Sequence, residues 1–130
     1  MKLILNNKIL HTTVNADDIY NAFDGMGRSY NIVIIEDDAS DSYMQAVCSM
    51  LDGVLEARIY ENNDYKHYRA EICSEEADFD KKIRMLDTPA FTIKVPQKQV
   101  INSCTIKKIL IQFLTAKNIC GNCKWVETDL

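Results

Sequence analysis

The sequence predicts a single α+β domain over residues 1–130, in which a mainly antiparallel sheet of five or six strands is covered by a long C-terminal helix and a shorter N-terminal helix. Three apolar-rich runs, at residues 43–51, 54–60 and 65–73, have the composition of strands and are joined by turn residues. A later stretch, from Pro96 to residue 117, carries apolar side chains at helical spacing. With 130 residues and a hydrophobic content of 47%, the chain is long enough to bury a core of its own.

The three runs are predicted to form an antiparallel meander. Asp52-Gly53 is expected to join the first two, because a type I′ turn needs a positive φ at both central residues and these residues tolerate it. Glu61-Asn62-Asn63-Asp64 has similar turn chemistry and is expected to join the second and third. Apolar residues alternate with polar ones along the middle run, so one face of the sheet is predicted to be dry and the other to contact water.

The N-terminal part is predicted to supply the shorter helix and further strands. Residues 2–6 and 8–14 are short apolar runs separated by Asn6-Asn7, which indicates an opening hairpin or a single bent edge strand. Asn15 is expected to cap a helix that ends near Gly25. Residues 30–35 are a β-branched run, which predicts a central strand that is apolar on both faces.

Two elements are predicted between the meander and the long helix. Ser74 is expected to cap a short helix that extends to Leu86, with early acids and late bases that match the helix dipole. Residues 91–95 alternate as another strand. Pro96 then begins the long helix, which is expected to be the main cover of the sheet. Its apolar stripe consists of Val100, Cys104, Ile106, Ile109, Leu110, Phe113 and Leu114.

The net charge of −4 hides a strong asymmetry along the chain. Residues 36–80 carry thirteen acidic side chains against three basic ones, whereas residues 81–130 carry three acidic against nine basic ones. The acidic segment would repel nucleic acid but could attract a basic protein. Alternatively, the basic third folds back on the acidic segment and relieves its repulsion.

Five cysteines leave at least one thiol unpaired, and reduced thiols are expected. Cys48, Cys73 and Cys104 lie in apolar patterns and are expected to be small buried hydrophobes. Cys120 and Cys123 have the spacing of a thiol redox pair, but a redox pair begins a helix, and this pair follows the last predicted one. The favoured interpretation is a turn at residues 121–122, after which residues 124–128 return as a final strand.

The remaining patterns favour a cytoplasmic protein without catalytic chemistry, metal or cofactor. The longest apolar runs are too short to cross a bilayer, and the first residues lack the features of a secretion signal. The acidic run at residues 36–41 lacks the spacing of a calcium loop, and His11 and His67 are not at a paired metal-ligand spacing. Ser and Thr residues occur without a glycine-flanked nucleophile turn, so no enzyme is predicted.

Several short motifs resemble those of small bacterial immunity proteins, which neutralise polymorphic or contact-dependent growth inhibition toxins. They span residues 43–128 and comprise Tyr43-Met44-Gln45-Ala46, Asp52-Gly53, Leu55-Glu56-Ala57-Arg58, His67-Tyr68-Arg69-Ala70, Val95-Pro96, Gln112-Phe113-Leu114-Thr115-Ala116 and Lys124-Trp125-Val126. The resemblance implies a cytoplasmic antidote that binds one cognate toxin domain, often a nuclease or deaminase. Such an antidote blocks the active site or substrate groove of the toxin without chemistry of its own.

Two sets of residues are candidates for the contact with a toxin. The acidic set would fill the basic groove of a toxin that acts on nucleic acid, and it comprises Glu36, Asp37, Asp38, Asp41, Glu75, Glu76 and Asp78. The aromatic set would anchor the interface by burial, and it comprises Tyr60, Tyr65 and Tyr68. The alternatives from other classes are a small thiol redox protein that uses Cys120 and Cys123, and a structural subunit of a larger assembly.

Overall fold

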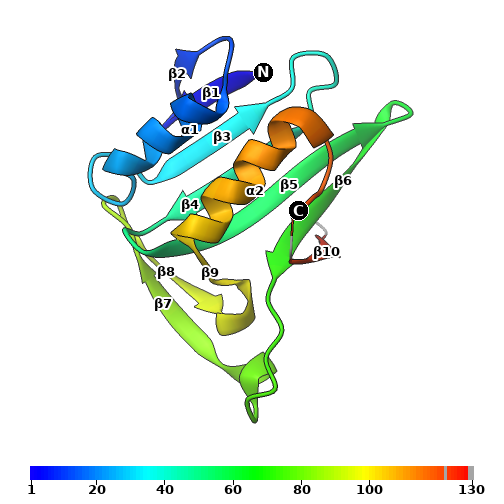
Figure 1. The fold of residues 1–130 in the computed structure, drawn as a ribbon. Coiled ribbons are helices and arrows are strands. Elements are labelled where there is room, and N and C mark those ends of the chain that lie inside the picture. The colour runs from blue at the N-terminus through cyan, green and yellow to red at the C-terminus, as the bar shows by residue number, and fades with distance from the viewer. Residues whose placement is uncertain (122, 129–130) are drawn as a thin grey trace.

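The computed structural model describes residues 1–121 and 123–128, which form a large antiparallel sheet with two helices on one of its faces (Figure 1). Within these residues the sheet has eight strands, in the order β10-β6-β5-β4-β3-β1-β2, and β9 pairs with β5. The elements are β1 (Lys2–Leu5), β2 (Lys8–His11), α1 (Ala16–Ala22), η1 (Phe23–Gly25), β3 (Ile32–Glu36), β4 (Tyr43–Cys48), β5 (Asp52–Glu61), β6 (Asp64–Glu71), η2 (Phe79–Lys81), β7 (Ile83–Asp87), β8 (Thr92–Pro96), η3 (Gln97–Gln99), β9 (Ile101–Asn102), α2 (Ser103–Ala116) and β10 (Lys124–Thr128).

The predicted N-terminal elements are confirmed. β1 and β2 form an antiparallel hairpin whose turn residues Asn6 and Asn7 have φ values of 46° and 70°. The Asn15 side chain accepts a hydrogen bond from the backbone of Asp18 at 3.0 Å, and the Asp18 carboxylate accepts one in return at 2.9 Å. This reciprocal pair is a capping box, which satisfies free backbone donors at the start of α1. β3 lies inside the sheet between β1 and β4, as predicted for residues 30–35.

The meander is confirmed, but its first turn is not where the sequence indicated. Antiparallel pairing joins β4 to β5 and β5 to β6, and Asn62 and Asn63 form the second turn with positive φ values of 52° and 65°. Asp52 and Gly53, however, belong to β5, and the chain reverses over residues 49–51. Gly53 instead allows the backbones of β4 and β5 to approach each other closely, since a Cβ at this position would lie 2.5 Å from the carbonyl oxygen of Val47.

The predicted fold class is wrong in two respects. The large sheet has eight strands among the described residues rather than five or six, and β7 and β8 form a separate two-stranded sheet. The long C-terminal helix does not exist: Pro96 ends β8, and residues 101–102 pair with β5 before α2 begins. Asn102 caps α2 by accepting a hydrogen bond from Thr105 at 2.8 Å, so the chain becomes helical only over the fourteen residues of Ser103–Ala116.

The helix predicted from Ser74 to Leu86 is also wrong. Only η2 is helical there, and β7 pairs antiparallel with β8. In β7 the side chain of Leu86 is buried whereas those of Ile83 and Met85 are exposed, which is the period of two typical of a strand. Hairpin pairing of β7 with β8 therefore outweighs the helix signals that begin at Ser74.

The core lies between the sheet and the helices α1 and α2. Strand residues alternate between this core and the opposite face, and α2 contributes Ile106, Ile109, Leu110 and Phe113 to it. Cys48 is buried as predicted, but Cys73 and Cys104 are exposed, so the prediction for those two thiols is wrong. A second, smaller cluster joins β7 and β8 to the large sheet, and it comprises Val54, Leu86, Val95 and Val100.

Candidate functional site

The face of the sheet that α1 and α2 leave uncovered is the candidate site, and we call it the open face. The register of the strands places its side chains in rows across the sheet. One row contains Glu36, Tyr43, Arg58, His67 and Thr128, and the neighbouring row contains Ile4, Ile34, Gln45, Glu56, Arg69 and Val126. The Asn62-Asn63 turn sets this register, because it pairs Tyr60 with Tyr65 and so Arg58 with His67.

Arg58 is the centre of a compact cluster on the open face. Its Nε donates a hydrogen bond to Nε2 of His67 at 2.7 Å. Its guanidinium carbon lies 4.5 Å from the ring centroid of Tyr65 and 5.5 Å from that of Tyr43, which are cation–π distances. The Tyr60 ring packs on the Tyr65 ring at a centroid distance of 5.3 Å. We call Tyr43, Arg58, Tyr60, Tyr65 and His67 the tyrosine–arginine cluster.

His67 is held in a neutral form inside this cluster. Because Nε2 accepts from Arg58, the ring proton of the neutral imidazole lies on Nδ1. The side chain is only 7% exposed, and Nδ1 has no hydrogen-bond partner among the described residues. Burial, and then the positive charge of Arg58, lower the pKa of His67 below its ordinary value. An unsatisfied buried donor costs about 1–3 kcal/mol, so the position of His67 lowers the stability of the fold by about that amount.

The lowered pKa of His67 predicts a pH dependence of stability. As the pH falls below about 6.5, the unfolded chain protonates this histidine first, so the folded state loses stability until the pH reaches the lower folded pKa. His67→Gln keeps an acceptor for Arg58 but does not titrate. We expect the wild type to lose more unfolding free energy than His67→Gln between about pH 7.5 and about pH 5.5 in urea titrations. Parallel pH profiles for the two proteins would contradict this.

The neighbouring row contains a second charge group, in which the arginine has a carboxylate partner. Nη2 of Arg69 lies 3.0 Å from Oε2 of Glu56, and the Gln45 amide donates to Oε1 of Glu56 at 3.0 Å. Nη1 of Arg69 also donates to Gln99 at 3.2 Å. In contrast, Arg58 has no carboxylate within ion-pair distance in the part of the chain that the structure describes. The open face therefore carries one compensated and one uncompensated arginine.

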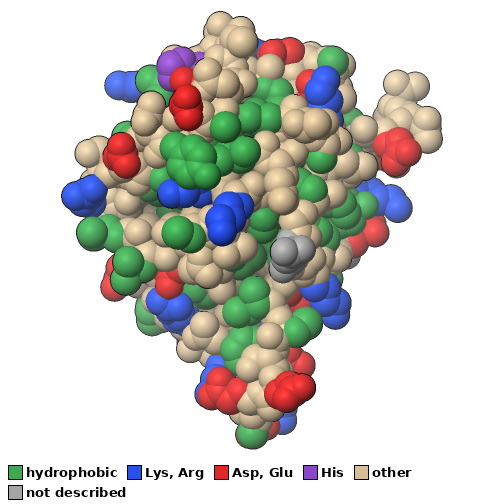
Figure 2. Space-filling model, viewed as in Figure 1, with side chains coloured by type: hydrophobic (Ala, Val, Ile, Leu, Met, Phe, Trp, Pro, Cys, Tyr) green, Lys and Arg blue, Asp and Glu red, His purple; other side chains and the backbone are tan. Residues whose placement is uncertain are grey.

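The structure separates the acidic residues predicted to form one contact surface. Residues 36–41 follow β3 at one end of the sheet, whereas residues 75–78 follow β6 and lie at the opposite end, toward the tip at the bottom of Figure 1. Figure 2 shows acidic side chains gathered at that tip. Glu75, Glu76 and Asp78 are exposed there, and Glu76 pairs with Lys82. The two acidic segments thus do not form a continuous patch.

Two of the four acidic residues at the end of β3, Glu36 and Asp38, are paired with cations of the same chain. The N-terminal amine lies 3.3 Å from Asp38, and the Lys2 amine lies 3.5 Å from Asp38 and 3.9 Å from Glu36. Burial by itself raises the pKa of Asp37, but hydrogen bonds from Ser40 and the Ala39 backbone outweigh it and leave the pKa lowered. Of the predicted acidic residues here, Asp41 is exposed and takes a positive φ of 64°.

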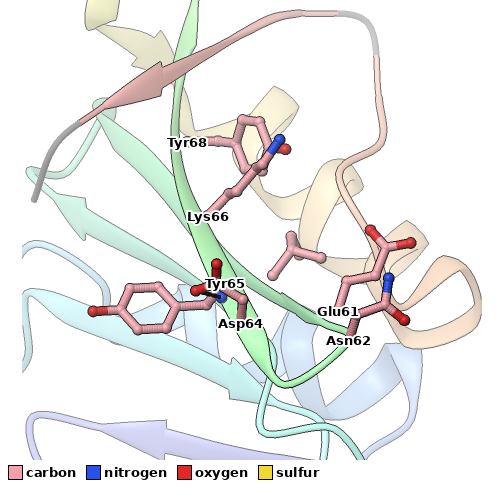
Figure 3. A pocket seen from close by; sticks show the side chains of 7 residues that line it. Glu61, Asn62, Asp64, Tyr65, Lys66 and Tyr68 are labelled. Atoms are coloured by element: carbon pink, nitrogen blue, oxygen red, sulfur yellow. Dashed lines mark hydrogen bonds between the residues drawn. The ribbon is translucent and has the colours of Figure 1, made fainter.

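The three tyrosines predicted as anchors lie on two different faces. Tyr60 and Tyr65 belong to the open face, whereas Tyr68 packs against the core on the helix side. Tyr68 and Lys66 line a hollow of about 460 Å³ beside the β5–β6 turn, and Figure 3 shows the Tyr65 ring pointing to the other side of β6. Only two of the three predicted tyrosines can therefore act in one interface.

The Cys120 and Cys123 thiols are in an environment that disfavours the thiolate. Burial raises the pKa of both groups, that of Cys123 to about 11. The Cys120 thiol donates to the carbonyl oxygen of Ile109 at 3.7 Å. A redox pair needs the opposite shift. The turn predicted at residues 121–122 lies partly outside the described residues, and the final strand β10 is confirmed by its pairing with β6.

Two further features bear on function. Within residues 1–121 and 123–128, no group of three or more His, Cys, Asp or Glu side chains is arranged to hold a metal ion. No helix of the described residues is long and apolar enough to cross a membrane.

Comparisons of the chain with protein-family models, with curated proteins and with solved structures found no match. Sequence reasoning found Tyr60 and Tyr65 but missed Tyr43, Arg58 and His67 as members of one cluster. The alternation of side chains along β5 and β6 could have indicated this cluster, because it places residues 58, 60, 65 and 67 on one face once the register of the two strands is known.

Proposed function

We propose that the chain is an immunity protein that binds a cognate bacterial toxin domain in the cytoplasm through its open face and blocks the active site or substrate groove of the toxin. The observation that carries this proposal is the tyrosine–arginine cluster on the sheet face opposite α1 and α2. Tyrosine and arginine are the residue types that dominate binding energy at protein interfaces. The protein itself performs no chemistry in this function, and the toxin is a nuclease or deaminase.

The apolar part of the open face supports the same function. Ile4 pairs with both Ile34 and Ile9, in the row of the open face next to the one that contains Tyr43 and Arg58. Ile9 is 58% exposed at the edge of the sheet. An apolar patch next to aromatic residues and one arginine is the composition of an interface core, whereas a surface that only contacts water is richer in charge.

Co-expression with the toxin domain encoded beside this gene tests the proposal. We expect the wild type to restore growth. We expect Tyr60→Ala/Tyr65→Ala to weaken the purified complex by at least about 30-fold in titration calorimetry, because a single anchor is worth about 2 kcal/mol and the two losses are not simply additive. Tyr20→Ala is the matched control, since Tyr20 is 46% exposed and Tyr65 45%, but Tyr20 lies on α1 on the other side of the sheet.

A second control addresses the thiol alternative. Cys120→Ser/Cys123→Ser is expected to protect cells as well as the wild type does. Loss of protection in this variant, or equal weakening by Tyr20→Ala and Tyr60→Ala/Tyr65→Ala, would refute binding through the open face. Failure of the wild type to bind or neutralise the toxin domain would refute the immunity function.

A further inference from the structure

Arg58 is a positive charge that contacts no carboxylate among residues 1–121 and 123–128, in a chain that is acidic overall. The whole sequence carries a net charge of −4, and the paired cations Lys2, Arg69, Lys82, Arg84 and Lys98 each contact a carboxylate. Arg58 contacts His67 and the tyrosine rings instead. An arginine enclosed by aromatic rings is partly stripped of water, which strengthens its attraction for an incoming anion.

Glu56 is the carboxylate nearest to Arg58 along β5 on the open face, but it is already engaged. Its Oε1 accepts from Gln45 and its Oε2 from Arg69, each at 3.0 Å. Rotating Glu56 toward Arg58 would break both contacts and leave Arg69 uncompensated. The side chains of this face therefore hold Glu56 away from Arg58 and leave the positive charge of Arg58 available.

The orientation of the guanidinium group restricts how a partner can approach it. Its Nε is occupied by His67, and Nη1 makes only a long contact of 3.5 Å with the Tyr60 hydroxyl. Nη2 has no hydrogen-bond partner within residues 1–121 and 123–128. The two terminal nitrogens form a planar fork that matches the two oxygens of a carboxylate. Because His67 and the tyrosine rings already position this fork, little side-chain entropy is lost when it binds.

We propose that the partner inserts an aspartate or glutamate side chain between the rings of Tyr43 and Tyr65, where its carboxylate binds the terminal nitrogens of Arg58. This inference rests on the proposed immunity function and names the chemistry of the partner at the open face. In the central charged contact, this chain then supplies the cation and the toxin supplies the anion. The signs are opposite to those of an interface in which the acidic segments of this chain fill a basic groove of the toxin.

A double-mutant cycle with the neighbour-encoded toxin domain tests this contact. Each aspartate and glutamate on the toxin surface is replaced by alanine, and the affinity of each variant is measured with wild-type protein and with Arg58→Met, which keeps the aliphatic stem. We expect Arg58→Met to weaken binding by about 30-fold or more. One toxin carboxylate variant is expected to cause a similar loss with the wild type and almost none with Arg58→Met.

Two further variants test the charge of Arg58: a reversal of its charge, and a control substitution of another exposed cation in the same sheet. Arg58→Asp should abolish binding, and a lysine in place of the coupled toxin carboxylate should restore it at least tenfold. Lys124→Met is the control cation, because Lys124 is exposed on β10 in the same sheet and should show no coupling to that carboxylate. If Arg58→Met fails to fold, the same cycle is run with Arg58→Lys, which keeps the charge but loses the fork.

The outcomes separate this inference from the function on which it rests. Coupling between Arg58 and one toxin carboxylate supports the inference. Absence of any coupled carboxylate, in a complex that Tyr60→Ala/Tyr65→Ala still weakens, would overturn the inference and leave the immunity function standing. Absence of binding by the wild type would overturn both.

Discussion

Phe113→Ala is expected to lower the free energy of unfolding by about 3–5 kcal/mol. The Phe113 side chain is completely buried, and it lies on the face of α2 that packs on the sheet. Removing the ring loses its transfer free energy and leaves a cavity that the surrounding strands cannot fill without moving their backbone ladders. Urea-induced unfolding, followed by circular dichroism and by Trp125 fluorescence, measures the change.

Lys108→Ala is the control for Phe113→Ala, because Lys108 lies on the same helix and is exposed. Its effect is expected to stay within about 0.5 kcal/mol. A loss below about 1 kcal/mol for Phe113→Ala would contradict the packing of α2 against the sheet. Since α2 covers the face opposite the tyrosine–arginine cluster, Phe113→Ala is also expected to leave the toxin affinity of the folded protein unchanged.

Gly27→Ala is expected to destabilise the fold by about 2–4 kcal/mol through backbone strain and overpacking. Gly27 has a φ of +80°, and a Cβ at this position would lie 2.3 Å from the backbone nitrogen of Met50. The neighbouring atoms belong to the backbone of the β4–β5 turn, so no side-chain rotation can relieve the contact. The same urea titration measures the loss.

Gly25→Ala provides the comparison for Gly27→Ala. Gly25 lies outside the left-handed region, and its added Cβ would approach the hydroxyl of Tyr30 at 2.7 Å, which is the far end of a side chain that can move. We therefore expect a smaller loss for Gly25→Ala than for Gly27→Ala. Equal losses would show that the close approach of residue 27 to the β4–β5 turn does not matter for stability.

Local patterns were sufficient for elements whose determinants lie close together in the chain. The capping box between Asn15 and Asp18 needs a separation of only three residues, and the Asn62-Asn63 turn supplies its own positive φ values. Both predictions are confirmed for this reason. Asp52-Gly53 has an equally strong local signal, but there the contact of Gly53 with Val47 and its pairing with β9 decide its role.

Helix predictions failed where the chain pairs as a strand instead, with a distant partner in one segment and with the next strand in the other. The segment from Pro96 to Asn102 has apolar residues at helical spacing, yet Ile101 pairs with Gly53, which is 48 residues earlier in the chain. The segment from Ser74 to Leu86 has helix-like charges, yet residues 83–87 pair with the next strand, β8, in a hairpin. The pairing of Ile101 with Gly53 does not appear in any local pattern, and in both segments the cross-strand hydrogen bonds outweigh helix propensities of less than about 1 kcal/mol per residue.

The sequence by itself determined the alternation within β5, which places Arg58 and Tyr60 on one face of that strand. The register of β5 with β6 then brings Tyr65 and His67 to the same face. The tertiary structure decided which face α1 and α2 would cover, and therefore which side chains remain for a partner. It also decided that Glu56 would bind Arg69 and leave Arg58 without a carboxylate. Side-chain period is a property of a single strand, whereas burial and charge compensation depend on neighbours that only the assembled sheet brings together.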